Sequence, residues 1–233
     1  MKLEAESFME AVKDINSNVL PLFQLDTRKS RIVYFLLSTI TVLSLRMLEN
    51  TVHEYAHVIV VLLAGGELQG LPLVTPFGGF TGWINVQESW LPVVNIAGSV
   101  TAAIVMLGIF LPVFLKAKHV WMRWIGYWGA AVIPVNIVFY WFMAPFLASS
   151  MNYDPIGFAA NVGISPAWIV GLIAAIPFCL TVWWMQKATR SLVVETVQDK
   201  SSFHWKCLIF YYIISMGFPI ISYLNLLDAL KFW

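Results

Sequence analysis

The chain has 233 residues, of which 59% are hydrophobic and 12% are charged, and its formal net charge at pH 7 is +1. Soluble domains are typically about 45–50% apolar and about 25% charged, so the composition predicts an integral membrane protein. Its near-neutral charge includes no block of basic residues, and a nucleic-acid partner is therefore not expected.

The N-terminal segment 1–30 is expected to stay on the mature protein, because acidic residues follow Lys2 at once and no apolar signal core comes after them. Apolar residues recur in it at helical spacing: Phe8, Val12, Ile15, Val19 and Leu22. This pattern predicts an amphipathic segment lying on the membrane surface. Chance periodicity in a solvated leader is the alternative.

Five long apolar stretches follow, and a helix needs about 20 such residues to cross a bilayer. They lie within 32–64, 90–115, 124–148, 165–186 and 207–227. We therefore predict an all-α polytopic membrane protein with about five transmembrane helices. The first stretch is interpreted as one long helix, because it contains no Gly or Pro; a break at Glu49-Asn50 is the alternative. The chain is read as a single domain, in which 31–164 form a core and 165–233 add two helices.

Lys and Arg are distributed unevenly along this predicted topology. Twelve of them precede the first stretch or lie in the connections after the second and the fourth, whereas 65–89 and 149–164 contain none. Because positive residues concentrate in cytoplasmic loops, this pattern predicts a cytoplasmic N-terminus, with 65–89 and 149–164 on the opposite side. A cell (plasma) membrane is the default location.

The segment His53-Glu54-Tyr55-Ala56-His57 carries the strongest chemical signal. On a helix, residues i and i+4 share a face, so His53 and His57 are predicted to bind one zinc ion. Glu54 is the candidate general base, since zinc lowers the pKa of bound water to about 7. The alternative is that these three side chains only satisfy one another within a helix bundle.

A catalytic zinc site needs a third protein ligand. Asp154 is the leading candidate, because it follows 124–148 on the predicted side of His57. Its alternative role is to cap a helix that begins at Pro155. The other candidates on that side of the membrane are Glu67, Glu88 and Asp228.

Three polar residues precede His53 on about the same helical face: Arg46, Glu49 and Asn50. A ligating histidine usually donates its second N–H to a carboxylate or carbonyl. We therefore expect Glu49 to accept from His53 and Arg46 to balance its charge. A simple Arg46–Glu49 pair within the helix is an equally good interpretation.

The segments 67–75 and 80–87 flank Pro76–Gly79 and predict a β-hairpin. Non-helical backbone at membrane depth must lie against protein or water, so this hairpin is expected beside the zinc cavity. Its free edge can pair with an extended substrate, which makes Gly78, Gly79 and Phe80 candidate substrate-binding residues. A purely structural plug is the alternative.

These features together resemble the site-2 protease family of intramembrane zinc metalloproteases, in its small form without a PDZ domain. The similarity covers about 30–165: the His-Glu-x-x-His helix ending at Gly65-Gly66, then Pro76–Gly79, Ala97-Gly98 and Asp154. The resemblance implies that Asp154 is the third zinc ligand. It also implies an endopeptidase whose partners are the lipid bilayer and a transmembrane protein substrate that unfolds locally before cleavage.

The chain departs from the family pattern at Ser99, where proline is usual, and at Pro155, where glycine is usual. Asn136 lies further upstream of the aspartate than the family's asparagine, and both it and Asn95 are interpreted as buried residues that bond across helices. Two other functions remain open. One is a membrane zincin of another family with a glutamate ligand, and the other is a non-catalytic transporter subunit or chaperone with a structural metal site.

Overall fold

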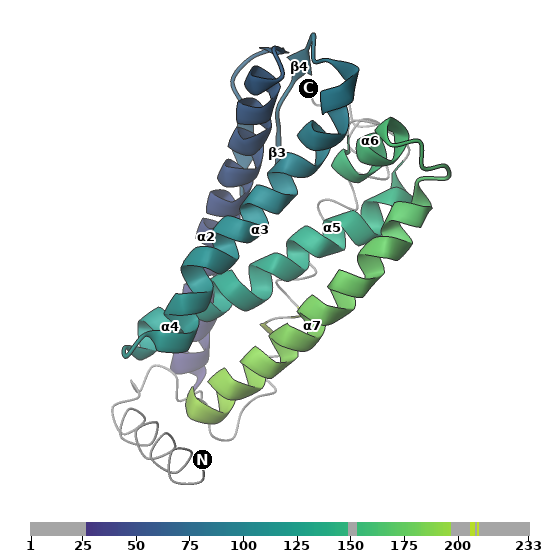
Figure 1. Ribbon diagram of the computed structural model, residues 1–233. Helices are drawn as coiled ribbons and strands as arrows, with labels where there is room; N and C mark the ends of the chain where they lie inside the picture. The colour runs from purple at the N-terminus through teal and green to yellow at the C-terminus, as the bar shows by residue number, and fades with distance from the viewer. Residues whose placement is uncertain (1–26, 149–152, 197–205, 208, 210–233) are drawn as a thin grey trace.

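The computed structural model describes residues 27–148, 153–196, 206, 207 and 209. Six α-helices dominate these residues (Figure 1): α2 (Arg28–Leu63), α3 (Leu91–Lys116), α4 (Val120–Tyr127), α5 (Ile133–Leu147), α6 (Asp154–Asn161) and α7 (Trp168–Thr196). A 3₁₀ turn, η2 (Glu88–Trp90), precedes α3, and a π-helical turn, η3 (Trp128–Val132), joins α4 to α5.

Four helical segments within the described residues are long and apolar enough to cross a membrane. They are Arg28–Leu63, Glu88–Lys116, Val120–Leu147 and Trp168–Thr189. These match the first four of the five predicted spans. The fifth, 207–227, lies almost entirely outside the described residues, as does the predicted amphipathic segment.

Helix α2 is continuous from Arg28 to Leu63, so the prediction of one unbroken first helix is confirmed. A capping box fixes its start: Thr27 accepts from the backbone N–H of Ser30, and the Ser30 hydroxyl accepts from the backbone N–H of Thr27. At 1.5 Å per residue its 36 residues span about 54 Å. Because a hydrocarbon core is only about 30 Å thick, the helix must tilt or extend beyond it.

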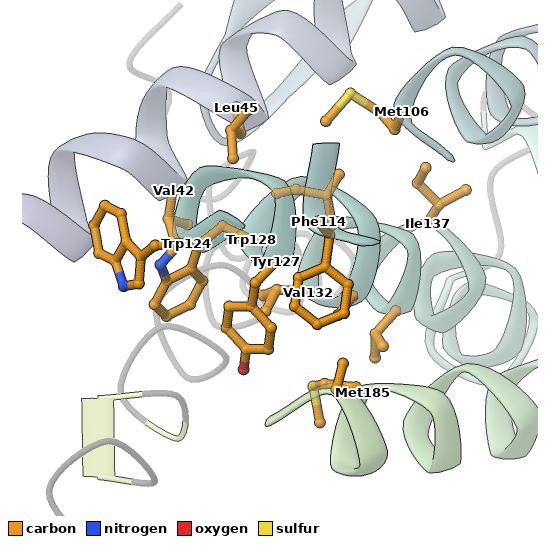
Figure 2. Close-up of a cluster of buried hydrophobic side chains, with 14 of the residues drawn as sticks. Val42, Leu45, Met106, Phe114, Trp124, Tyr127, Trp128, Val132, Ile137 and Met185 are labelled. Carbon is orange, nitrogen blue, oxygen red and sulfur yellow. The ribbon is translucent and has the colours of Figure 1, made fainter. Parts of the chain in front are cut away.

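Helix α2 packs beside α3, and α5 packs beside α7 (Figure 1). The main hydrophobic core joins all four helices and α4, at the end of the molecule that carries α4 (Figure 2). Trp124, Tyr127 and Trp128 form its centre, with each side chain at most 2% exposed. Most buried polar side chains of α2 lie further along that helix, between Arg46 and His57, toward the end that carries the β-structure.

A small β-structure follows α2, as predicted, and the strands are shorter than expected. Strands β2 (Leu73–Thr75) and β3 (Gly78–Phe80) pair antiparallel around Pro76-Phe77, with Val74 opposite Gly79. Strands β1 (Glu67–Leu68) and β4 (Trp83–Ile84) form a second antiparallel pair outside the first. Both β2 and β3 lie against α2.

Charge is separated between the two ends of the helical assembly. Seven of the described basic residues belong to helix ends or connections at the α4 end: Arg28, Lys29, Arg31, Lys116, Lys118, Arg123 and Lys187. Among the described side chains, the end carrying the hairpin and α6 has acidic residues but neither Lys nor Arg. This separation agrees with the predicted topology, while the compartment that each end faces stays a prediction.

Candidate metal centre

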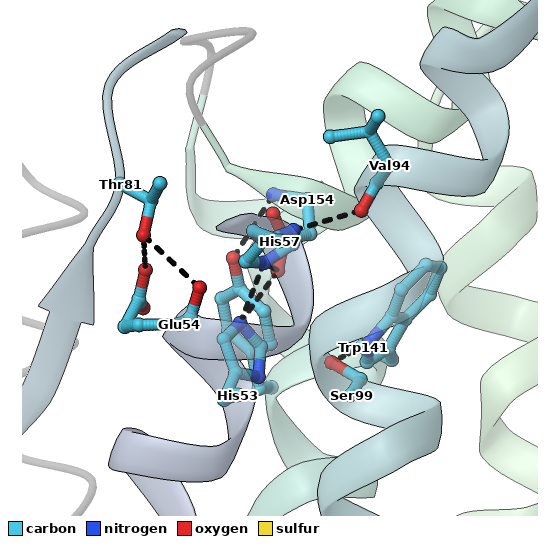
Figure 3. A network of polar contacts seen from close by, with 9 residues as sticks. His53, Glu54, His57, Thr81, Val94, Ser99, Trp141 and Asp154 are labelled. Atoms are coloured by element: carbon cyan, nitrogen blue, oxygen red, sulfur yellow. Dashed lines mark hydrogen bonds and ion pairs between the residues drawn. The ribbon is translucent and has the colours of Figure 1, made fainter. Parts of the chain in front are cut away.

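The candidate site is built on the last third of α2, a helix long and apolar enough to cross a membrane. His53 lies ten residues before Leu63, or about 15 Å from the end of the helix. One turn separates it from His57, so both imidazoles lie on the same face. Glu54, the residue after His53, is also buried, but its side chain points toward the hairpin (Figure 3).

The fold brings Asp154 from the start of α6 onto the two histidines. Its Oδ2 lies 3.0 Å from Nε2 of His53 and 3.5 Å from Nε2 of His57. The two Nε2 atoms are 3.1 Å apart. In the described part of the chain, these three residues form the group of side chains that can hold a metal ion.

The three separations can be compared with those of a tetrahedral zinc site. Zinc binds imidazole nitrogen and carboxylate oxygen at about 2.0–2.2 Å, so two ligand atoms on a tetrahedron lie about 3.3–3.5 Å apart. The observed 3.0, 3.1 and 3.5 Å are near this edge length. The residues present therefore fit zinc, with two nitrogens and one oxygen as donors.

His57 is held from three directions, and its side chain is 2% exposed. Its Nδ1 donates to the carbonyl of Val94, at 2.8 Å, which leaves the lone pair of Nε2 directed at the group. Trp83 stacks on the ring with centroids 5.7 Å apart. One turn past Val94, Gly98 brings the backbone of α3 so close that a Cβ atom there would lie 2.5 Å from this Nε2.

Asp154 is the first residue of α6, and Tyr153 is the N-cap, with no side-chain capping bond. The carboxylate therefore does not serve as a helix cap, which was the alternative interpretation. Its backbone N–H donates to the Tyr140 hydroxyl at 3.0 Å. Burial alone would raise the pKa of the Asp154 carboxyl, but its interactions with the neighbouring imidazoles of His53 and His57 outweigh burial and hold the pKa below its usual value. The group is thus kept as a carboxylate, the form that binds metal.

The side chain of Glu54 extends from α2 toward the β-structure, and the residue is 4% exposed. The Thr81 hydroxyl, in the loop between β3 and β4, lies 2.7 Å from Glu54 Oε2 (Figure 3). Strand β3 passes so near that a Cβ atom on Gly79 would lie 2.5 Å from Oε1. A buried carboxyl group thus follows a candidate metal-binding histidine directly in sequence, with strand β3 against it.

The structure gives partners for each of the three polar residues upstream of His53. Arg46 forms an ion pair with Glu49, which is the simple intrahelical interpretation. Asn50 instead donates its side-chain N–H to the Thr75 carbonyl at 2.7 Å and so fastens β2 to the helix. The expected hydrogen bond from His53 to Glu49 stays a prediction, and the contact of Asn50 is with the hairpin.

Of the other candidate ligands, the two that the structure describes, Glu67 and Glu88, are not part of the group. Glu67, on β1, accepts from the Asn85 side chain at 3.2 Å, and Glu88, in η2, is exposed. Asp228 is outside the described residues. Of the predicted substrate-binding residues, Gly78, Gly79 and Phe80 together form β3, and Phe80 is 55% exposed.

Sequence reasoning missed the residues that hold the site in place: Thr81, Trp83, Val94 and Tyr140. Val94 acts through its backbone carbonyl, which no residue type reveals. Thr81 and Trp83 lie two positions apart in the segment predicted as a hairpin. This spacing puts them on the same face of a strand, but it does not reveal that the face packs against Glu54 and His57. Asn136 is buried, as expected, but its side-chain oxygen has no hydrogen-bond partner among the residues that the structure describes.

Comparisons with family models, curated proteins and solved structures gave no match for this chain. The function is therefore argued from the site itself.

Proposed function

We propose that the protein is an intramembrane zinc endopeptidase that hydrolyses a peptide bond in or near a transmembrane segment of another membrane protein. The observation that carries the proposal is the group His53, His57 and Asp154, beside buried Glu54 and within a helix long enough to span a bilayer. Charged and imidazole groups inside a span are costly, and they usually mark a functional site. The resemblance to the site-2 protease family supports the same conclusion.

His53, His57 and Asp154 would hold the zinc ion, and the fourth position would remain open. Structural zinc sites usually have four protein ligands, whereas catalytic sites have three; three residues make up the described group. Zinc bound in this way supplies a Lewis acid and activates water for attack on a carbonyl. The donor set thus favours catalysis over a purely structural metal.

Glu54 would serve as the general base. It follows His53 directly in sequence, and its side chain lies on the side of the hairpin, outside the group of candidate ligands. In hydrolysis it accepts a proton from the attacking water and returns it to the leaving amine. The peptide C–N bond breaks, and the products are a carboxylate and an amine.

Strand β3 would receive the substrate. Within the described residues it pairs with β2 alone, and it passes directly over Glu54. An extended peptide can add to such a strand through backbone hydrogen bonds, which are independent of side-chain identity. Three side chains that are large, mainly apolar and exposed, Phe80 of β3 itself and Tyr55 and Ile59 of α2, suit a substrate that arrives through lipid.

The proposal is tested with full-length protein purified in bilayer nanodiscs and with quenched fluorescent peptides derived from transmembrane segments. Wild-type protein should contain one zinc per chain and cleave at least one of these peptides. Glu54→Gln should keep the zinc and lose at least about 100-fold in kcat, because it removes the base but no ligand. Full activity of Glu54→Gln would refute the proposal.

Glu88→Gln serves as the matched carboxylate control. It lies on the same side of the molecule as the site but outside the metal group, so zinc content and activity should not change. Loss of zinc in Glu88→Gln, with retention in Asp154→Ala, would instead support a zincin with a glutamate ligand. Zinc bound without any Glu54-dependent cleavage would support the structural-metal alternative.

A further inference from the structure

We infer that Thr81 is a positioning residue for Glu54: its hydroxyl fixes one carboxylate oxygen and leaves the other as the oxygen that exchanges protons. This inference rests on the proposed function, since it assigns a partner to the general base. Thr81 belongs to neither the His-Glu-x-x-His segment nor the metal group. It comes from the loop that follows strand β3.

The contact is short, buried and directed. Thr81 Oγ1 lies 2.7 Å from Glu54 Oε2 and 3.3 Å from the backbone oxygen of Glu54. A hydroxyl has one proton to donate, and the carboxylate oxygen is both the nearer and the stronger acceptor of the two. Both residues are 4% exposed, so water does not readily replace this donor.

The other carboxylate oxygen has a different environment. Oε1 of Glu54 lies on the side of Gly79, where a Cβ atom would come within 2.5 Å of it. The strand backbone therefore packs directly against the carboxyl group of Glu54, and only a residue without a side chain fits there. With Oε2 engaged by Thr81, the arrangement assigns Oε1 to accept and return the proton.

The same contact links the base to the strand that would bind substrate. The hairpin is fastened to α2 at two points one helical turn apart: Asn50 to the Thr75 carbonyl, and Glu54 to Thr81. Strand β3 lies between these two attachments. Displacement of β3 would therefore change the orientation of Glu54, and a correctly seated strand would hold Glu54 in its working position.

The test compares Thr81→Val, which keeps the shape but removes the hydroxyl, with Thr81→Ser, which keeps the hydroxyl. Thr51→Val is the matched control, because Thr51 bonds only one turn back to the Met47 carbonyl on the same helix. All are examined as zinc-loaded full-length protein in bilayer nanodiscs. Zinc content should equal that of wild type in all three.

The first measurement does not depend on activity. Infrared spectra of protein labelled with ¹³C-glutamate, minus those of Glu54→Gln, isolate the carboxyl vibrations of Glu54. These bands should shift in Thr81→Val and stay in place in Thr81→Ser and Thr51→Val. Unshifted bands in Thr81→Val would overturn the inference, whether or not the protein proves to be a peptidase.

The second measurement is the cleavage of the fluorescent peptides. Thr81→Val should lower kcat by at least about tenfold, as expected for one hydrogen bond to a charged group, with KM within about twofold. Thr81→Ser should restore kcat to within about threefold of wild type. Equal losses in Thr81→Val and Thr81→Ser would overturn the inference, as would a loss confined to KM. If the wild-type protein cleaves none of the peptides but Thr81→Val shifts the infrared bands, the proposed function is refuted and the Thr81–Glu54 contact is supported.

Discussion

Replacing Gly98 by alanine should weaken zinc binding while leaving the fold intact. A Cβ atom at this position would lie 2.5 Å from Nε2 of His57 and 2.6 Å from Nε2 of His53. Ordinary carbon contacts are at about 3.5–4.0 Å, so α3 or the two rings must move by about 1 Å. His57 cannot turn freely, because the Val94 carbonyl on the same helix holds its Nδ1.

Overpacking of this kind costs about 1–3 kcal/mol, which corresponds to a loss of about 5- to 150-fold in zinc affinity. The assay is competition with a chromogenic chelator. Gly108→Ala is the control, because it lies on the same helix and a Cβ atom there meets nothing within 4 Å. Equal zinc affinity in Gly98→Ala and Gly108→Ala would refute the placement of the metal at His53 and His57, against Gly98 of α3.

Three further changes test other parts of the structure. Asp154→Asn should lower zinc affinity at least about tenfold, because the amide loses the negative charge of a ligand; dialysis followed by metal analysis would show it, and unchanged retention would remove Asp154 from the ligand set. Asn50→Asp removes the donor to the Thr75 carbonyl, so amide hydrogen exchange in 73–80 should become faster, whereas unchanged exchange would show that the hairpin is held elsewhere. Tyr127→Phe deletes the hydroxyl that meets Thr189 Oγ1 at 2.8 Å and should destabilise the helix packing by about 1 kcal/mol in thermal unfolding without affecting zinc content; a loss of zinc would contradict the separation of core and site.

Long-range features of the fold were predictable where one strong physical requirement dominated. The bilayer demands long apolar helices, and four of the predicted spans match helices in the structure. The absence of Gly and Pro in 32–63 correctly indicated one continuous helix. Pro76 and the glycines after it marked the turn of the hairpin, although the strands are only two or three residues long.

Within the site, prediction succeeded where spacing along one helix determines geometry. The four-residue step from His53 to His57 places both rings together regardless of the rest of the fold. Contacts across elements were harder to predict. The approach of Asp154 to His53 spans 101 positions in sequence, and the resemblance to a known family, rather than local pattern, suggested it.

The support of the site depends on contacts that residue types do not encode. Asn50 appeared suited to the metal from its helical phase, but its side chain meets the carbonyl of Thr75. Thr81 is one of several polar residues in the hairpin, and only the path of β3 over α2 makes it the partner of Glu54. Such side-chain-to-backbone and loop-to-helix contacts follow from tertiary packing.

The most direct test of the proposed metal centre is X-ray absorption at the zinc edge on purified wild-type protein and on Asp154→Ala. The wild-type spectrum should show one zinc per chain with nitrogen and oxygen neighbours at about 2.0–2.2 Å and the scattering pattern of two imidazoles. Asp154→Ala should lose the metal or one oxygen neighbour. A wild-type protein without zinc, or with zinc in an environment that the Asp154→Ala change does not alter, would contradict the assignment of His53, His57 and Asp154 as its ligands.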